Sequence, residues 1–488
     1  MLSLSLLIKI LFVGLIVLLL TPAKEKKILK QVALTSSFTA FVYSLLFWLN
    51  FDNLEPNFQF IEQFTWIEGA NVNFYLGLDG ISLFFIILST FLIPLCLLGS
   101  WNVIEQNVKS YLAFFLLMEI ALIFVFSVLD VLLFYIFFES ILIPMFLIIG
   151  IWGTRSRKIR ASYLFFLYTL VGSVLMLLAI FYIIEEVGTT DFNIISNHFF
   201  DINVQKLLWI AFFCAFAAKI PMVPVHLWLT EAHVEAPTAG SVILAGVLLK
   251  LGTYGFLRFS FPLFPAATFY FTPLMLTLAS VGVVYTSLTA IRQTDVKRVV
   301  AYASIAHMNV VLIGMFSLNT QGIEGSIFQM LSHGIVAAAL FFSIGVMYDR
   351  YHSRLIKYYS GLVFTMPIFM TFFLLFTMGN IALPGTSSFV GEFLILAGII
   401  QTNYVATFIG ASGMVLGGAY SLWLFNRVAF GNLKTQYVFR FSDMNRREFS
   451  YFFPLLFLMI LLGLYPDLFL EPMHLSVSLL IEHIHLNS

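Results

Sequence analysis

Six ionisable side chains interrupt long apolar stretches of this 488-residue sequence. The surrounding stretches, such as LLFYIFFESILIPMF and GVLLKLGTYG, carry almost no other charge. An ionisable group at the centre of a lipid bilayer costs at least about 2.5–3.5 kcal/mol, so it is rarely kept there without a use. Acids, amines and imidazoles in series can each bind and release a proton, with water bridging the longer gaps. The series therefore predicts a proton-transfer path formed by Glu139, Lys219, Lys250, His307, His333 and Glu392.

Each of these residues also has a simpler interpretation, as half of a structural charge pair or as a side chain that reaches the membrane surface. Six in one chain, two of them beside helix-breaking residues, favour proton transfer. Glu139 and Lys219 are a candidate coupled pair. A carboxylate about 4 Å from an amine stabilises its charged form by about 4 kcal/mol at an effective dielectric constant of about 20. Moving or neutralising Glu139 would then switch Lys219 between holding and releasing a proton, although the sequence shows no contact.

Other polar residues support weaker predictions. Glu119 and Asp130 either assist proton entry or lie at an interface, and Lys9 is expected to extend its amine to the membrane surface. Two further clusters lack the compact spacing of a metal site, and we expect neither to bind a metal. These clusters are His226, His233 and Glu235, and the C-terminal Glu482, His483 and His485, which are typical of the polar edge of an interfacial helix.

The two cysteines, Cys96 and Cys214, lie in separate apolar stretches without a CxxC pattern. They cannot supply the ligands of an iron–sulfur cluster or a structural zinc ion, and we expect two buried apolar side chains. Any redox chemistry connected with this protein is therefore expected on another chain.

The composition identifies the solvent that this chain faces. Hydrophobic residues make up 60% of the sequence and charged residues only 10%, against about 25% charged residues in soluble domains. The 25 basic residues balance the 25 acidic ones, which gives no support for a nucleic-acid partner. We predict an all-α, polytopic membrane protein with about fourteen transmembrane helices. Their approximate limits are 3–21, 31–50, 78–100, 111–129, 131–151, 161–184, 207–229, 236–258, 271–291, 299–318, 323–347, 361–401, 404–430 and 450–466.

Basic clusters follow only odd-numbered spans, which fixes the expected orientation. They are KEKK after the first span, TRSRKIR after the fifth, RQTDVKR after the ninth, DRYHSRLIK after the eleventh, and Lys434, Arg440, Arg446 and Arg447 after the thirteenth. Even-numbered loops, such as EEVGTTD, are acidic or neutral. By the positive-inside rule, the basic loops face the cytosol or matrix and both termini lie on the opposite side.

Two of the expected spans contain helix breakers. Pro221 and Pro224 interrupt the seventh, and Pro384 and Gly385 interrupt the twelfth. Discontinuous helices in corresponding positions indicate inverted repeats. Because five spans separate the two breaks, we predict oppositely oriented five-helix repeats. The expected divisions are 1–110 for helices 1–3, 111–258 for the first repeat, 264–430 for the second, and 431–488 for a basic loop, helix 14 and a C-terminal tail.

Several of these stretches together resemble a known family. WIAFFCAFAAKIPMVPVHLWLTEAHVEAPTAGSVILAGVLLKLGTYG (209–255), DVKRVVAYASIAHMNVVLIG, FQMLSHGIVAAALFF and ALPGTSSFVGEF are similar to the antiporter-like membrane subunits of respiratory complex I. YLGLDGISL and FYIFFESILIPM extend the resemblance toward the N-terminus. Glu392 stands where several related subunit types carry a lysine, and 467–488 is too short for the long lateral helix of one of them.

The resemblance implies a role for each of the six residues. Glu139 and Lys219 would form the input pair, Lys250, His307 and His333 the central relay, and Glu392 the terminal proton exchanger. It also implies a subunit of proton-translocating NADH:ubiquinone reductase without a cofactor of its own, with other complex I membrane subunits, lipid and protons as its partners.

The 56 phenylalanines fit an AT-rich organelle gene, which places the chain in the mitochondrial inner membrane, with a bacterial plasma membrane as the alternative. The competing functions are a cation/proton antiporter without a redox arm and a structural spacer.

Overall fold

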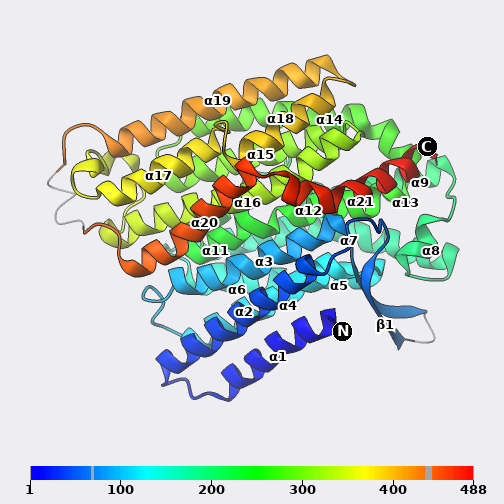
Figure 1. Ribbon diagram of the computed structural model, residues 1–488, viewed down its shortest axis with the longest axis horizontal. Coiled ribbons are helices and arrows are strands. Elements are labelled where there is room, and N and C mark those ends of the chain that lie inside the picture. Colours follow the sequence, from blue (N-terminus) through cyan, green and yellow to red (C-terminus); the bar gives the residue numbers. More distant parts are fainter. Residues whose placement is uncertain (1, 68–70, 435–441, 487–488) are drawn as a thin grey trace.

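The computed structural model describes residues 2–67, 71–434 and 442–486, so Arg440 of the last basic loop lies outside the described residues. Its helices lie side by side along the long axis of the molecule (Figure 1). Three apolar helices are short: α1 (Leu4–Leu20), α17 (Pro367–Asn380) and α18 (Ser387–Ile399). In the described part, 12 others are long and apolar enough to span a membrane: α2 (Lys26–Leu49), α3 (Gly80–Gly99), α4 (Val108–Ser127), α5–α6 (Val131–Trp152), α7 (Lys158–Val187), α9 (Ile202–Lys219), α11–α13 (Thr238–Leu263), α14 (Pro265–Ile291), α15 (Val296–Met315), α16 (Thr320–Tyr351), α19 (Tyr404–Ala429) and α20 (Arg446–Leu464).

The predicted all-helical membrane fold is confirmed, apart from one β-hairpin. Strands β1 (Gln59–Ile67) and β2 (Val72–Leu78) pair antiparallel between α2 and α3. This segment is too polar and too short to cross a bilayer, so a search for spans leaves it as a loop. The expected C-terminal tail is also structured: α21 (Asp467–Leu486) packs against α3 and α16. The N- and C-termini both point toward the end of the bundle opposite the α1–α2 turn, as the charge pattern predicts (Figure 1).

Both predicted helix breaks are present. Helix α9 ends at Lys219, and α10 (Leu227–Glu235) begins beyond the two prolines. Helices α17 and α18 are separated by a turn in which Gly385 has a φ of +91°, a left-handed conformation that glycine adopts readily. Helix α20 approaches this turn so closely that a Cβ added at Gly463 would lie 2.4 Å from the Gly385 carbonyl oxygen.

Two irregularities were not predicted. The fifth span divides at Ile141 into α5 (Val131–Ser140) and α6 (Leu142–Trp152), because Pro144 has no N–H for the preceding turn. The eighth span contains two π-helical segments, Leu244–Leu248 and Phe256–Ser260, on either side of α12 (Lys250–Gly255). Wider turns of this kind are frequent at functional sites.

The inverted repeat stays a prediction, and one recurring feature of the structure supports it. Asp130 caps α5, the Val131 N–H donates to the Thr190 carbonyl at 3.0 Å, and Thr190 follows the 30-residue α7. In the second predicted repeat, Asp295 caps α15, the Val296 N–H donates to the Arg354 carbonyl at 3.0 Å, and Arg354 follows the 32-residue α16. The same cap and the same strand-like bridge thus occur at the matching place in each half.

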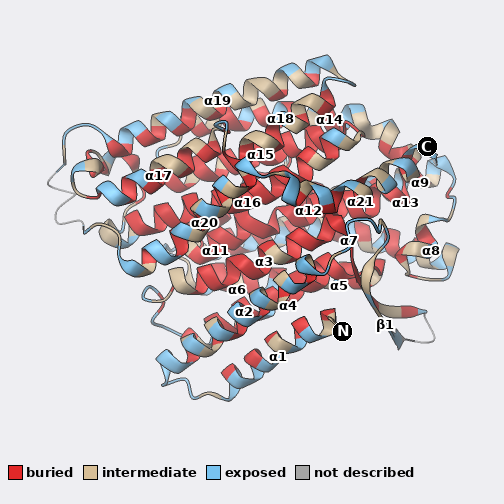
Figure 2. Cartoon of the chain, viewed as in Figure 1, coloured by how far each residue is buried: buried red, intermediate tan, exposed pale blue. Residues whose placement is uncertain are grey.

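Burial separates an inner group of helices from an outer one (Figure 2). The most apolar 18-residue stretches of α11–α13 and α16 are entirely buried, whereas α7, α14 and α19 expose large apolar side chains such as Val171, Tyr270 and Val415. An apolar outer surface is what lipid requires. The helices that carry Lys250 and His333 therefore lie at the centre, shielded from the bilayer, whereas α5 and α9, which carry Glu139 and Lys219, are only half-buried.

Candidate functional site

Glu139 and Lys219 meet where two interrupted helices lie together. Glu139 is near the end of α5, and Lys219 is the last residue of α9. The buried Lys219 amine donates a hydrogen bond to the Phe138 carbonyl at 3.2 Å and lies 4.2 Å from the centre of the Phe138 ring. Glu139 and Lys219 interact electrostatically without a direct ion pair among the described residues. The structure thus brings the predicted input pair together.

Lys250 and His333 are in direct contact. Lys250 is completely buried at the start of α12, just after the first π-helical segment, and His333 lies on α16. The Lys250 amine donates to the Ala245 carbonyl at 2.5 Å and lies 2.8 Å from His333 Nδ1. The wider π-helical turn changes the hydrogen bonds of the backbone here, and the Ala245 oxygen accepts from the amine. Local backbone geometry therefore holds Lys250 against the imidazole.

His307 and Glu392 form the other end of the path. The Nδ1 atom of His307, on α15, lies 2.9 Å from Glu392 Oε1, on α18. Gln329, on α16, donates to the same carboxylate oxygen at 3.1 Å. Glu392 is only 2% exposed, so this carboxylate depends on its protein partners for polar contact.

The two contacts are joined through the imidazole rings. The ring centres of His307 and His333 are 5.8 Å apart, and neither Nε2 atom has a protein hydrogen-bond partner among the described residues. A cavity of about 10 Å³ borders His307 and Glu392, close to the smallest space that holds one water. Lys250, His333, His307 and Glu392 therefore form a contiguous series of neighbouring groups, in which the described residues show no direct hydrogen bond between the two imidazole rings. Lys219 and Lys250 have no hydrogen bond between them in the described part of the chain.

Two residues of the predicted basic loops are buried, and one of them, Lys297, lies in a helix instead of a loop. Lys297 and Arg354 are only 3% and 2% exposed, because the first turn of α15 and the segment after α16 fold into the protein. The Lys297 amine donates to the Ala236 carbonyl at 2.8 Å and to Ser241 Oγ at 2.9 Å. Ser241 in turn donates to the His233 carbonyl at 3.1 Å. These buried hydrogen bonds lie near the N-terminal, basic end of α15. The sequence showed the charge of Lys297 but not its contacts.

Gln329 is the site residue that sequence reasoning missed. It precedes His333 by one helical turn, so both side chains share a face of α16. That spacing was available in FQMLSHG, but a neutral amide is inconspicuous beside titratable residues.

The weaker candidates have separate environments. Glu119 is fully buried in α4, Lys9 is exposed on α1, and Cys96 is buried. Asp130 accepts a hydrogen bond from the Leu133 N–H and another from the Thr190 hydroxyl, and burial raises the pKa of its carboxyl group to about 6.

The two clusters rejected as metal sites are dispersed. His226 packs edge-on against Tyr285, whereas His233 stacks on Phe341 with ring centres 4.6 Å apart. Glu482, His483 and His485 lie on α21, where His485 packs against Phe269. Within the described ranges, no group of three or more potential ligands could hold a metal ion.

The fold and this series define a polytopic membrane protein with a buried titratable path between discontinuous helices. A family model described as NADH:quinone oxidoreductase/Mrp antiporter, TM, matches residues 128–417. A second, described as NADH-ubiquinone oxidoreductase chain 4, amino terminus, matches residues 7–129. NADH-ubiquinone oxidoreductase chain 4 of Marchantia polymorpha is 56% identical over 481 residues, which cover 99% of this chain and 97% of that protein. The protein of the same name from Arabidopsis thaliana is 57% identical over 470 residues, with 96% and 95% coverage.

Solved structures agree. A chain of respiratory complex I from Thermus thermophilus matches with a TM-score of 0.90 and 27% identity, over 99% of this chain and 100% of that chain. A chain of an archaeal membrane-bound sulfane sulfur reductase matches with a TM-score of 0.85, over 96% of this chain and 77% of that one; at 21% identity this match shows the fold alone. The chain belongs to the NADH-ubiquinone oxidoreductase chain 4 family.

Proposed function

We propose that Lys250, His333, His307 and Glu392 carry protons through an antiporter-like membrane subunit of respiratory complex I, and that Glu139 and Lys219 supply them. The chain is such a subunit, takes part in proton pumping, and is a multi-pass protein of the mitochondrial inner membrane that associates with other membrane-arm subunits. The observation that carries the residue roles is the contiguous series from the Lys250 amine to the Glu392 carboxylate.

The geometry supports stepwise proton transfer. The Lys250 amine and His333 Nδ1 are 2.8 Å apart, which is within the reach of direct transfer. An imidazole relays a proton by accepting it on one ring nitrogen and releasing it from the other. The Nε2 atoms of His333 and His307 have no protein partner in the described ranges, so they are free to exchange a proton through water. His307 Nδ1 then lies 2.9 Å from Glu392 Oε1, where the series ends.

We further propose that this chain holds no redox centre and binds no cofactor, so that electron transfer elsewhere in complex I drives the proton movement. Two observations support this. Cys96 and Cys214 are both free, and two cysteines alone fall short of the four ligands of an iron–sulfur cluster. The cavity that borders His307 and Glu392 has a volume of about 10 Å³, which is room for about one water and not for a cofactor.

The decisive variant is Glu392→Gln in the assembled complex. Glutamine keeps an acceptor for His307 and Gln329 but cannot exchange a proton at neutral pH. The variant should therefore fold normally, but proton transfer should stop at this position. We expect proton uptake into vesicles, and NADH oxidation coupled to ubiquinone, to fall at least about tenfold, as for the loss of an acid–base group. Oxidation of NADH by an artificial acceptor, which does not require pumping, should be unchanged.

Glu231→Gln is the matched control. Glu231 forms a half-exposed ion pair with Arg298 at 2.6 Å, outside the series, so the same chemical change should leave pumping intact. If Glu392→Gln pumps like the unaltered complex, the relay assignment is wrong. Purification addresses the alternative: an antiporter without a redox arm would exchange cations without NADH and would not co-migrate with flavin- and cluster-bearing subunits.

A further inference from the structure

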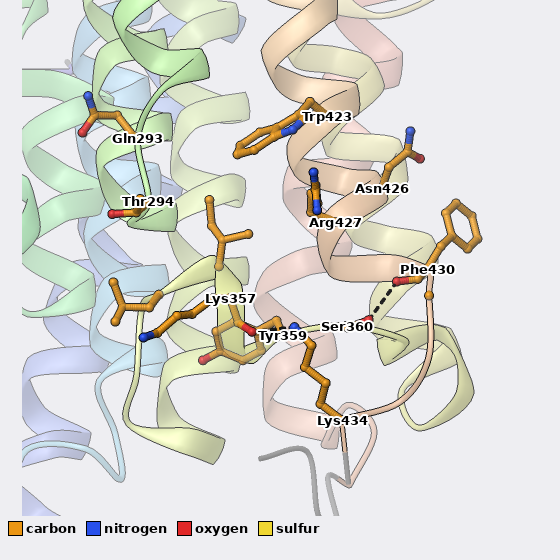
Figure 3. Close-up of a pocket in the computed structure, with 13 residues that line it drawn as sticks. Gln293, Thr294, Lys357, Tyr359, Ser360, Trp423, Asn426, Arg427, Phe430 and Lys434 are labelled. Atoms are coloured by element: carbon orange, nitrogen blue, oxygen red, sulfur yellow. Dashed lines mark hydrogen bonds between the residues drawn. The ribbon is translucent and has the colours of Figure 1, made fainter. Parts of the chain in front are cut away.

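A second site lies at the basic end of the bundle, away from the proton path. A cavity of about 510 Å³ opens between the turn after α14, the short helix Ile356–Tyr358 and the end of α19 (Figure 3). Trp423, Asn426 and Arg427 line it from α19, and Gln293 and the Lys357 segment face them. The cavity could hold a polar group much larger than water, and nothing in the proposed proton path uses it.

The charge in this cavity is of one sign. Lys357, Arg427 and Lys434 line it, whereas no aspartate or glutamate does. None of the three cations forms an ion pair with a carboxylate in the described part of the chain. The Lys434 amine donates to the Lys357 carbonyl at 2.6 Å, which holds two of the cationic segments together. Three basic side chains thus line the cavity without an ion pair to a carboxylate among the described residues, and the Lys357 amine also lies 4.9 Å from the centre of the Tyr358 ring. The protein as a whole has no net charge.

The surroundings of the cavity are those of a membrane interface. Arg427 lies over the ring of Trp423, with its guanidinium carbon 5.9 Å from the ring centre, and Phe430 at the rim is 56% exposed. Exposed apolar residues continue from the cavity toward the middle of the bilayer, with Leu288 on α14 at 50% and Leu422 on α19 at 40%. Cations beside an indole, followed by exposed apolar side chains, have the same order of polarity as the headgroup and acyl chains of a phospholipid.

We propose that this cavity binds the phosphate headgroup of an anionic phospholipid, whose acyl chains follow the exposed faces of α14 and α19. Arg427 supplies a planar fork of donors suited to phosphate oxygens, and the two lysines add point charges. Basic pockets between transmembrane helices on the matrix or cytoplasmic side fit such headgroups. A free phosphate would contact the basic side chains but would leave the adjacent exposed apolar residues Leu288, Leu422 and Phe430 uncovered, so we assign a lipid. This assignment is independent of the proton relay.

Photolabelling of the intact complex tests the proposal. The complex is placed in phosphatidylcholine nanodiscs that contain a photoactivatable cardiolipin, or in a parallel sample a photoactivatable phosphatidylcholine. Labelled peptides are then identified by mass spectrometry. We expect the anionic probe to label the α19 segment that carries Trp423 and Arg427 in preference to the neutral probe. The variant R427Q/K434Q should reduce that labelling at least about tenfold, since two of the three basic contacts to phosphate are lost.

The matched control is R157Q/R160Q, which removes two exposed cations at the start of α7, on the same side. Its labelling of α19 should equal that of the unaltered complex. R427Q alone keeps the Lys434–Lys357 contact, so reduced labelling in this variant cannot be attributed to a displaced loop.

Three results would overturn the proposal. The first is equal labelling by the anionic and neutral probes, and the second is unchanged labelling in R427Q/K434Q. The third is loss of labelling in the presence of excess inorganic phosphate alone, which would assign the cavity to a soluble anion. Protection of α19 from both probes would show that a protein partner covers this face, and it too would contradict a lipid site.

Discussion

Replacing Lys250 by methionine should stop proton transfer without unfolding the protein. The amine is fully buried and makes two short contacts, to the Ala245 carbonyl at 2.5 Å and to His333 Nδ1 at 2.8 Å. Hydrogen bonds to a charged group contribute about 1.5–3 kcal/mol each, so their loss costs about 3–6 kcal/mol. Methionine has a similar length and shape, and it removes an ammonium whose burial costs several kcal/mol. The two contributions nearly cancel, and the complex should assemble.

The functional effect should be large because the first carrier of the contiguous series is gone. We expect proton uptake into vesicles and ubiquinone-linked NADH oxidation to fall at least about tenfold. Lys250→Arg separates two possible roles of the amine. An arginine keeps the positive charge but does not release its proton at physiological pH, so this variant should be equally inactive if Lys250 is a proton carrier.

Lys158→Met is the control, since Lys158 is half-buried and also donates to a backbone carbonyl, that of Ile151 at 2.6 Å. The reasoning is refuted if Lys250→Met pumps normally in assembled complex. If Lys250→Arg alone pumps normally, Lys250 acts only as a fixed charge, and His333 must receive its proton by another route.

Two further changes test the fold around the site. Burial raises the pKa of the Asp130 carboxyl group to about 6, although the hydrogen bond from the Thr190 hydroxyl opposes this increase. Between these pH values the native state therefore keeps a proton on Asp130 that the unfolded state has released. The free energy of unfolding should fall by up to about 3 kcal/mol as pH rises from about 4 to about 6. In thermal melts, Asp130→Asn should make this decline smaller. Gly463→Ala should impair assembly on native gels, because its Cβ would lie 2.4 Å from the Gly385 oxygen, whereas Gly417→Ala, with its nearest neighbour at 3.6 Å, should assemble normally.

The candidate site residues could be identified from the sequence because ionisable side chains are rare in membrane-spanning helices. Glu139, Lys219 and Glu392 stand out in apolar stretches for the same reason that they cost energy there. The pairing of Glu139 with Lys219 was predicted, but the contact between Glu392 and His307 was not. Glu392 and His307 are separated by 85 positions, and nothing local indicates that α15 and α18 bring them within 2.9 Å. The resemblance to a family supplied roles for individual residues, whereas only the structure supplied the contacts.

The features that were missed share a physical origin. The π-helical segments beside Lys250 arise from packing between helices, and Leu244–Leu248 has no composition that distinguishes it from an ordinary helix. The burial of Lys297 and Arg354 also depends on residues that are distant in the sequence, because the Lys297 amine donates to the Ala236 carbonyl and the Arg354 guanidinium donates to the Thr154 hydroxyl. Sequence periodicity reports which residues can face lipid, but not which backbone carbonyl a buried cation will find.

The contacts of α16 determine how the two halves of the molecule can work together. Lys250 belongs to the first predicted repeat, and His307 and Glu392 belong to the second. The two groups meet through α16, which contacts Lys250 through His333 and Glu392 through Gln329, one turn apart on the same helix. The 2.8 Å distance between Lys250 and His333 therefore joins the two predicted repeats, whereas the 2.9 Å distance between His307 and Glu392 joins α15 to α18 within the second repeat. Independent rocking of one repeat against the other would open the contact between Lys250 and His333. A relay built in this way requires small local movements of side chains and water, with the helices held in place.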